Sequence, residues 1–269
     1  MPHARVSQRR AFTPVQLIIV LALLLFGVAL LAPIVARIRA SAAQARSMNN
    51  IRQLTLGTIN LADTYGGKLP PAAGAWDAGK PDKVGTVHYY ILPFIEQGPL
   101  FQKGGQLDGS PWKEGVAATP VPIFVDAQDT SAPPQFVYKD WLATTNYPGN
   151  YLVFKDGTNR FPASIPDGTS NTLMFVTRYQ MCNGAPTAWG YAGLYYWSPM
   201  FAYYSTEKFQ SAPSQDDCDP ARPQSIGGSS ILTGFCDGSA RPIRARVSPL
   251  TWFYLCHPAD GNVLGPDAF

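Results

Sequence analysis

The sequence predicts an α+β protein in which one long N-terminal helix packs on a C-terminal domain of antiparallel β-sheet with long loops. Three observations support this prediction. Residues 17–36 carry no charge, which is typical of a membrane-spanning helix. Residues 34–61 continue with apolar side chains three or four positions apart, as on one face of a helix. The rest of the chain holds short β-branched and aromatic segments separated by turn residues.

The uncharged run is long enough to cross a bilayer, since about 20 residues make about 30 Å of helix. We place the membrane segment at about 14–36 and expect a kink near Pro33, because a proline inside a helix removes a backbone hydrogen bond. Arginines flank the run on both sides: Arg5, Arg9, Arg10, Arg37 and Arg39. Positive charge before the run predicts a single pass with a cytoplasmic N-terminus, and the C-terminal domain on the other side.

The helix is expected to continue past the membrane segment as an amphipathic rod. Its apolar stripe consists of Ile34, Ile38, Ala42, Ala45, Met48, Ile51, Leu54 and Leu61. Such a stripe predicts a helix packed on its own domain, and the alternative is a surface for other subunits; one helix can serve both. Gly66-Gly67 and Pro70-Pro71 are expected to end the helix. The chain therefore divides into a basic leader, a helix and a globular domain at 1–11, 12–65 and 66–269.

Within the globular domain, turn residues alternate with short apolar segments. Asp-Gly pairs begin at 108, 156, 167, 237 and 260, and so many turns favour antiparallel strands. We expect loops at 69–85 and 98–120, and a short helix at 88–97 that Pro93 interrupts. The expected strands are 121–125, 151–154, 172–178, 229–235 and 239–247. Residues 251–255 form either a further strand or a short helix.

Charge argues against a nucleic-acid partner. The net charge of +3 comes from the three arginines of the leader, since the rest of the chain balances its basic and acidic residues. Lysines and arginines are scattered, and the closest group is Arg241, Arg244 and Arg246. A nucleic-acid-binding protein needs a basic patch or stripe, and none is visible.

The four cysteines all lie in the C-terminal third, at Cys182, Cys218, Cys236 and Cys256. An even count in an exported domain favours disulfides, and the absence of Cys-x-x-Cys argues against zinc and thioredoxin-like sites. We expect a Cys182–Cys218 bond that brackets a loop rich in proline and tyrosine. Cys236 and Cys256 either form a second bond or stay as buried thiols.

Catalytic and metal-binding patterns are scarce, which predicts a protein that is no enzyme and needs no cofactor. The common hydrolase, metalloprotease, phosphate-loop and dinucleotide motifs are absent. Beyond the leader only His88 and His257 remain as histidines. Calcium has weak candidate ligands in Asp216, Asp217 and Asp219, but their spacing does not match a calcium loop. The expected role of that segment is a solvated, disulfide-tethered loop.

Residues 189–204 are rich in tryptophan and tyrosine. Such side chains combine an apolar ring with a polar tip, so the segment can pack in the core, pack between subunits or bind a sugar. Packing is the commoner use, and sugar binding is the alternative.

Residues 9–17, Arg-Arg-Ala-Phe-Thr-Pro-Val-Gln-Leu, resemble the leader junction of type IV pilins and pseudopilins. In that family a membrane peptidase cuts after a glycine and the new N-terminal phenylalanine is methylated. Phe12 and Thr13 match the pattern, while Ala11 replaces the glycine. Gln16 replaces a glutamate that is thought to pair with the neighbouring subunit; it keeps a hydrogen-bonding amide without the charge. The resemblance implies cleavage between Ala11 and Phe12 by prepilin peptidase, and contacts with pilin-like subunits through the helix.

Further segments together resemble a large bacterial family of unknown function. They are Leu69-Pro-Pro, 91–97, Asn146-Tyr with Asn150-Tyr151, 167–172 and 235–239. Members of that family join a pilin-like N-terminus to a domain with a His, nine residues, then Asp-Gly. Asp237 and Gly238 match the Asp-Gly, while Gly227 stands in place of the histidine. We expect Asp237 to begin a hairpin turn, and any function that needs both parts of the motif to be lost.

The leading hypothesis is a non-enzymatic pilin-like or pseudopilin-like structural subunit of a type IV pilus or a type II secretion-like assembly. It is expected in the inner membrane, with its C-terminal domain in the periplasm or at the cell surface. The alternative is a monomeric binding module that is tethered by the same membrane helix and does not polymerise, with glycans as its candidate ligands. Gln16 favours this alternative, because an assembling pilin is expected to keep an acid there.

Overall fold

A computed structural model gives the structure of the chain and describes residues 14–76, 80–105, 115–193 and 195–268. Its internal contacts divide the chain into two units, Met1–Ala42 and Ala43–Phe269. Both units share the helix α1 (Pro14–Thr64), whose 51 residues confirm the predicted long helix. The boundary between the two units, at Ala42 and Ala43, therefore falls inside this helix.

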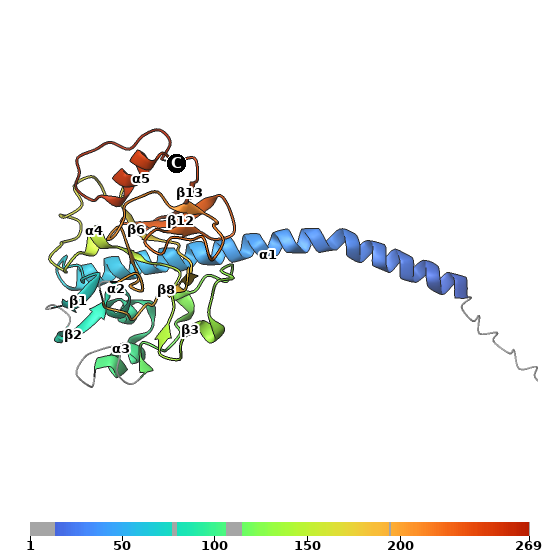
Figure 1. Cartoon of the computed structure of the whole chain (residues 1–269), viewed down its shortest axis with the longest axis horizontal. Coiled ribbons are helices and arrows are strands. Elements are labelled where there is room, and N and C mark those ends of the chain that lie inside the picture. The colour runs from blue at the N-terminus through green and yellow to red at the C-terminus, as the bar shows by residue number, and fades with distance from the viewer. Residues whose placement is uncertain (1–13, 77–79, 106–114, 194, 269) are drawn as a thin grey trace, which may run out of the picture. The chain divides into compact units, whose positions relative to one another are not determined.

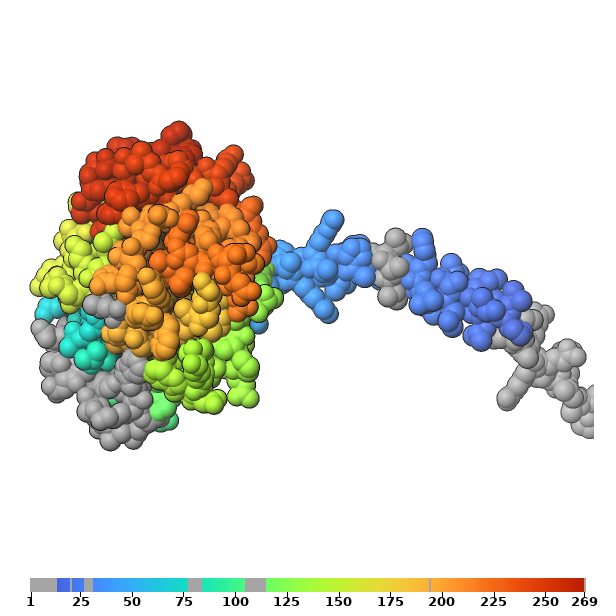
Figure 2. All heavy atoms as spheres, viewed as in Figure 1, coloured from blue at the N-terminus to red at the C-terminus, as the bar shows by residue number. Residues whose placement is uncertain are grey.

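In the first unit, the apolar part of α1 is long and apolar enough to cross a membrane. Its large side chains are exposed, as the blue residues in Figure 2 show, and Leu17, Leu24 and Ile38 are each more than half exposed. The helix runs through Pro33 without interruption, and the kink expected there stays a prediction. The basic leader lies outside the described residues.

The second unit is built on a five-stranded sheet in the order β13-β12-β6-β5-β9. These strands are β5 (Gly149–Asn150), β6 (Leu173–Val176), β9 (Met200–Phe201), β12 (Ser230–Phe235) and β13 (Ala240–Arg244). All neighbours are antiparallel except β5 and β9. The antiparallel sheet predicted from the turn residues is therefore confirmed, and three of the predicted strands, at 172–178, 229–235 and 239–247, are present.

Two helices cover the two faces of this sheet (Figure 1). The part of α1 from Ala43 onward packs on one face, where Ile51 and Leu54 join the main core. The helix α5 (Pro249–Cys256) packs on the other, where Trp252 lies in a second cluster. Residues 173–176 of β6 are all buried because both faces of that strand are covered. The apolar stripe of α1 is thus packed on its own domain from Met48 onward, as predicted.

Two glycines end α1, as the sequence predicts. Gly66 and Gly67 have φ values of 63° and 85°, the left-handed region that glycine enters without strain. The amide of Gly67 donates to the carbonyl of Ala62 at 2.7 Å, which satisfies a carbonyl that the helix leaves open. The four described Asp-Gly pairs also place glycine at positive φ, so the turn predictions at 156, 167, 237 and 260 are confirmed.

Two predicted strands are wrong. Residues 121–125 form the short 3-10 helix η3 (Pro122–Phe124), because a proline at its first turn suits a helical start and cannot donate to a ladder. Residues 151–154 form the helical turn α4 (Tyr151–Phe154). Its cap is Asn150, whose side chain accepts from the amide of Leu152 at 3.0 Å.

Two predicted loops contain regular structure. Residues 69–85 include the hairpin of β1 (Ala73–Trp76) and β2 (Lys80–Thr86), and residues 98–120 begin with α3 (Gly98–Gly105). The predicted helix at 88–97 divides into α2 (Val87–Tyr90) and η1 (Leu92–Ile95), with Pro93 in the first turn of η1. Residues 251–255 lie in α5, so the open choice there resolves to a helix.

The remaining elements are short. They are η4 (Pro134–Phe136), β3 (Val137–Tyr138), β4 (Leu142–Ala143), β7 (Met181–Cys182), β8 (Ala185–Pro186), β10 (Gln210–Ser211) and β11 (Gln224–Ser225).

Candidate functional site

The proposed processing region is only partly described. Ala11 and Phe12 lie outside the described residues, so cleavage between them stays a prediction. Gln16 lies in the first turn of α1 and is exposed. The side chain of Gln16 therefore lies on the surface of the apolar segment.

Asp237 and Gly238 form the turn between β12 and β13, as expected. Asp237 Oδ1 accepts from the amide of Ser239 at 2.8 Å, and its Oδ2 pairs with the guanidinium of Arg241 at 3.3 Å. Gly238 has a φ of 84°. A β-carbon there would lie 2.9 Å from Leu56 Cδ2. The turn therefore rests against α1, and the Asp-Gly pair serves the fit between sheet and helix.

Gly227 lies at the other end of the same strand. Gly227 precedes strand β12, and Asp237 follows that strand. The six residues of β12 therefore separate the two positions by about 20 Å of extended chain. Gly227 is exposed, with a φ of 75°. A side chain at 227 would lie close to Gln128 instead, since a β-carbon would come within 3.1 Å of Gln128 Oε1. The two parts of the motif are thus far apart along β12.

Asn146 is a buried crosslink. Its Nδ2 donates to Asp129 Oδ2 at 2.6 Å and to the carbonyl of Arg178 at 2.9 Å. Its Oδ1 accepts from the amide of Asp126 and from Gln180 Nε2, both at 2.8 Å. All the hydrogen-bonding positions of the amide are therefore used inside the fold.

Asn150 and Asp167 join distant segments in the same way. Asn150 Nδ2 donates to the carbonyls of Leu173 and Cys256, both at 2.8 Å, which connects β6 to α5. Asp167 accepts from the amides of Asp260 at 2.7 Å and Gly261 at 3.0 Å. The residues that carry the family resemblance thus hold the domain together.

The two described histidines are held by the backbone. His88 is fully buried, and its Nε2 donates to the carbonyl of Tyr147 at 2.8 Å. Burial, helped by the nearby Arg178 charge and opposed by the hydrogen bond to Tyr147, lowers the pKa of His88 from 6.5 to about 4, so the ring is neutral. His257 stacks on Phe253 and bonds the carbonyl of Phe253 at 2.8 Å. Within the described part of the chain, the hydrogen bonds given to these rings go to backbone carbonyls and not to a carboxylate that would orient them for catalysis.

Cys182 and Cys218 form a disulfide, as predicted. Cys236 and Cys256 are free and fully buried, which resolves the open choice in favour of buried thiols. Burial raises the pKa of both thiols well above the ordinary range. The thiols are therefore unreactive while the domain is folded.

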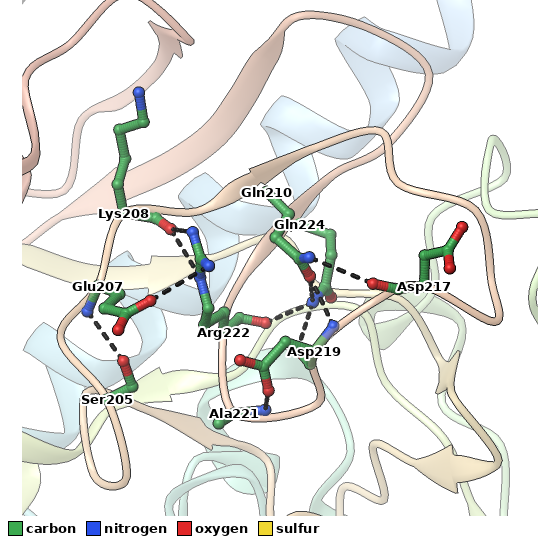
Figure 3. A network of polar contacts seen from close by, with 9 residues as sticks. All are labelled: Ser205, Glu207, Lys208, Gln210, Asp217, Asp219, Ala221, Arg222 and Gln224. Atoms are coloured by element: carbon green, nitrogen blue, oxygen red, sulfur yellow. Dashed lines mark hydrogen bonds and ion pairs between the residues drawn. The ribbon is translucent and has the colours of Figure 1, made fainter.

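The disulfide tethers a loop whose polar groups bind one another (Figure 3). Arg222 pairs with Glu207 at 3.2 Å, and Gln224 Nε2 donates to the carbonyls of Asp219 and Arg222. Asp219 N donates to Gln210 Oε1 at 2.6 Å. These contacts explain how a loop whose regular structure here is the short pair of strands β10 and β11 keeps one conformation.

The weak calcium candidates lie in this loop. Asp219 Oδ1 accepts from the amide of Ala221 at 2.9 Å, and Asp217 Oδ2 accepts from Ser214 Oγ at 2.6 Å. Figure 3 shows the Asp217 and Asp219 carboxylates pointing in different directions, and Asp216 is exposed. Among the described residues no three His, Cys, Asp or Glu side chains come together as metal ligands do. The three carboxylates therefore do not converge on one point in this structure.

A cavity of about 590 Å³ lies between α1 and η3 within the second unit. Its walls are mostly apolar, and its polar side chains are Arg46, Asn50 and Gln53, all from α1. Among the described residues that line it, none is an acid or a nucleophile.

Nine aromatic side chains form what we call the aromatic face. They are Tyr138, Trp141, Tyr151, Tyr191, Tyr195, Tyr196, Trp197, Tyr203 and Tyr204, each in contact with another ring of the set. The aromatic side chains of the predicted segment 189–204 therefore fall into two groups, one in the core and one in the aromatic face. Trp189 and Phe201 are buried in the core, while its tyrosines and Trp197 join rings from other parts of the chain.

Arg178 fixes the backbone beneath this face. The residue is buried, and its guanidinium donates to the carbonyls of Ser198 at 2.6 Å and Met200 at 2.9 Å. It also donates to the backbone carbonyls of Tyr196 at 3.5 Å and of Pro220 at 3.2 Å. Burial lowers the pKa of Arg178 to about 9, so it keeps its charge at neutral pH. The cost of burying that charge is offset by backbone carbonyls of the segment that carries the tyrosines.

Sequence reasoning missed several members of this arrangement. Arg178 follows an apolar strand, and an isolated cation after a buried strand is the signal that could have marked it. Tyr138, Trp141 and Tyr151 lie outside the aromatic segment, and only the fold brings them to it.

Comparison with known proteins gives one match. The model of the family described as Protein of unknown function (DUF1559) matches residues 36–248, which is most of the chain. No curated protein and no solved structure matches the chain significantly.

Proposed function

The chain belongs to the family described as Protein of unknown function (DUF1559), and on that basis we propose that it is a membrane-anchored, pilin-like structural subunit without catalytic activity. The assembly would be a type IV pilus or a type II secretion-like apparatus. The anchor would span the inner membrane once, with a cytoplasmic N-terminus, and the domain from Ala43 onward would lie in the periplasm or at the cell surface.

The continuity of α1 carries this proposal. One helix of 51 residues is apolar and exposed over its first part, and becomes part of a folded core over its last part. Apolar side chains as exposed as Leu24 and Ile38 need a membrane or other helices around them. Such a helix suits a subunit that is held in a bilayer and can later pack against copies of itself.

The chemistry of the domain supports a structural role. Asn146, Asn150 and Asp167 use their polar atoms to crosslink the fold, and Asp237 begins a turn against α1. His88 is neutral and enclosed by Phe124 and Phe175. The polar groups that would otherwise be candidates for catalysis are therefore engaged in holding segments together.

Processing is tested by the mass of the protein isolated from membranes. Cleavage by a prepilin peptidase predicts an N-terminus at Phe12, and Ala11→Trp should leave the leader attached. A matched control, Ala4→Trp, lies in the leader away from the junction and should leave cleavage intact. An intact leader in the wild-type protein would contradict the processing step.

Assembly is tested by electron microscopy of sheared surface fractions, with an antibody against the domain. Labelled filaments are expected, and they should disappear when Leu24 and Ile38 are replaced together by serine. A protein that stays entirely in the membrane fraction as a monomer would contradict the filament and leave the second candidate.

The second candidate is a monomeric binding module tethered by the same helix. Gln16 favours it, because its uncharged amide cannot form an ion pair with a neighbouring amine. The exposed aromatic face gives such a module a surface with which to bind. The two candidates differ in assembly state, so the filament experiment separates them.

A further inference from the structure

We propose that the aromatic face binds neutral polysaccharide chains, and that Arg178 is the positioning residue that shapes it. The proposal does not depend on filament formation, since the face lies wholly within the second unit and would serve a subunit or a tethered monomer equally.

The composition of the face points to sugars. Its most exposed rings are Trp141 at 40%, Tyr195 at 50% and Tyr204 at 44%, and Tyr196 and Tyr203 are also exposed. Each offers an apolar ring with a polar tip, which matches a pyranose, whose C–H face is bordered by hydroxyl groups.

The rings form a continuous row. From Trp141 the contacts pass to Trp197 at 6.2 Å, and from Trp197 to Tyr195 at 5.9 Å. They continue through Tyr196 and Tyr204. At the far end, Tyr203 meets Tyr204 at 4.6 Å and Tyr151 at 4.5 Å. Such a row has room for several linked sugars, so the expected ligand is a chain and not a single sugar.

The angles between the rings say which kind of chain fits. Neighbouring rings meet at interplanar angles from 47° to 85°, so they do not form one flat platform. A flat crystalline surface would touch only some of them. A single chain that can twist from one ring to the next would touch each in turn.

Charge favours a neutral ligand. The charged side chains that adjoin Trp141 in sequence are Lys139 and Asp140, one of each sign. Lys139 lies 5.1 Å from the centre of the Tyr138 ring. With opposite charges side by side, the Trp141 end of the face has no net attraction for an acidic polymer.

The face is held ready before any ligand arrives. Arg178 binds the carbonyls of Tyr196, Ser198 and Met200, and the amide of Ala188 donates to the carbonyl of Trp197 at 2.8 Å. A surface that is already ordered loses little conformational freedom on binding, which favours affinity. Arg178 is buried, with 2% of its surface exposed, so it acts by fixing the segment that carries the rings.

The test uses the full chain in a detergent whose headgroup is not a sugar, because sugar headgroups would occupy the face. The protein is mixed with four insoluble polymers, namely cellulose, chitin, amylose resin and β-1,3-glucan. At least one should retain it, and soluble oligosaccharides of that polymer should release it. Trp141→Ala and Tyr204→Ala should each weaken retention by about threefold to tenfold, which corresponds to about 0.7–1.4 kcal/mol.

Phe253→Ala is the matched control, because Phe253 is an exposed aromatic residue of α5 outside the face. It should bind as the wild type does. Retention by none of the four polymers overturns the proposal, and so does retention that falls equally in the control. Self-association that Trp141→Ala abolishes, without retention by any polymer, would assign the face to a contact between copies and also overturn it.

Discussion

A β-carbon on Gly234 would lie 2.5 Å from Cγ2 of Ile51, so strand β12 meets helix α1 with no side chain between them. The same β-carbon would lie 2.6 Å from Cγ2 of Thr55. Ile51 and Thr55 are fully buried and β-branched, so neither can easily swing aside. The close approach of the helix to the sheet therefore requires glycine at this position.

Gly234→Ala should lower the free energy of unfolding of the domain by about 1–3 kcal/mol, because it overpacks a filled core. Urea unfolding of the full chain in detergent, followed by tryptophan fluorescence, measures the loss. Gly228→Ala is the control, since a β-carbon there meets nothing within 4 Å. Equal stability of the two variants would show that α1 and β12 separate more easily than their contact implies.

The burial of His88 makes stability depend on pH. The pKa of His88 is lowered from 6.5 to about 4 in the folded protein, first by desolvation. Between these values the unfolded chain binds a proton that the folded chain does not, so stability is full above pH 6.5 and falls as the pH drops towards 4. The loss should reach about 2 kcal/mol at pH 5.

Urea unfolding of the wild type and of His88→Gln at pH 7 and pH 5 measures this contribution. The wild type should lose about 2 kcal/mol more than the variant between the two pH values. His257→Gln, at the other described histidine, should keep the fall seen in the wild type. The same pH dependence in His88→Gln would assign the fall to other groups.

The number of cysteines that react with a thiol reagent should differ under three conditions. In the folded protein no thiol should react with a thiol reagent, because Cys236 and Cys256 are buried and burial raises their pKa. In urea without reductant two thiols should react, and with reductant all four cysteines. Cys236→Ser should lower the count in urea from two to one. Four reactive thiols in urea without reductant would contradict the Cys182–Cys218 bond.

The parts of the fold with long or repeated signals could be predicted from the sequence. Helix α1 follows from its uncharged run, its stripe and Gly66-Gly67, and β6 follows from four consecutive apolar residues. The segments at 121–125 and 151–154 failed because short apolar runs suit a strand or a helical turn equally. At 151–154 the cap made by Asn150 decides for the helix, and a cap of this kind competes with strand pairing.

The candidate site could be predicted only where it is continuous in sequence. The tyrosines between 191 and 204 are visible as a group, but which of them face outward depends on how the chain turns. Trp141 and Tyr151 reach the face through tertiary contacts that no local pattern encodes. The separation of Gly227 from Asp237 also appears only when β12 is known to run between them.

Arg178 provides the most demanding test of how the aromatic face is built. Its guanidinium is buried and binds backbone carbonyls of the 196–200 segment, so its loss leaves those carbonyls without a donor. Arg178→Lys keeps the charge but cannot span the same acceptors, because an ammonium lacks the planar fork of the guanidinium. The expected cost is about 3 kcal/mol in unfolding free energy, within the range for breaking a buried charged network.

Hydrogen exchange separates this local role from a general loss of stability. In Arg178→Lys the amide of Ser198, which donates to the carbonyl of Tyr195, should lose protection more than the amides of β12 do. Arg222→Lys is the control, because Arg222 also binds a carbonyl, that of Lys208, but is partly exposed and should cost under about 1 kcal/mol. If protection fell equally throughout the domain, Arg178 would support the whole core and not the face in particular.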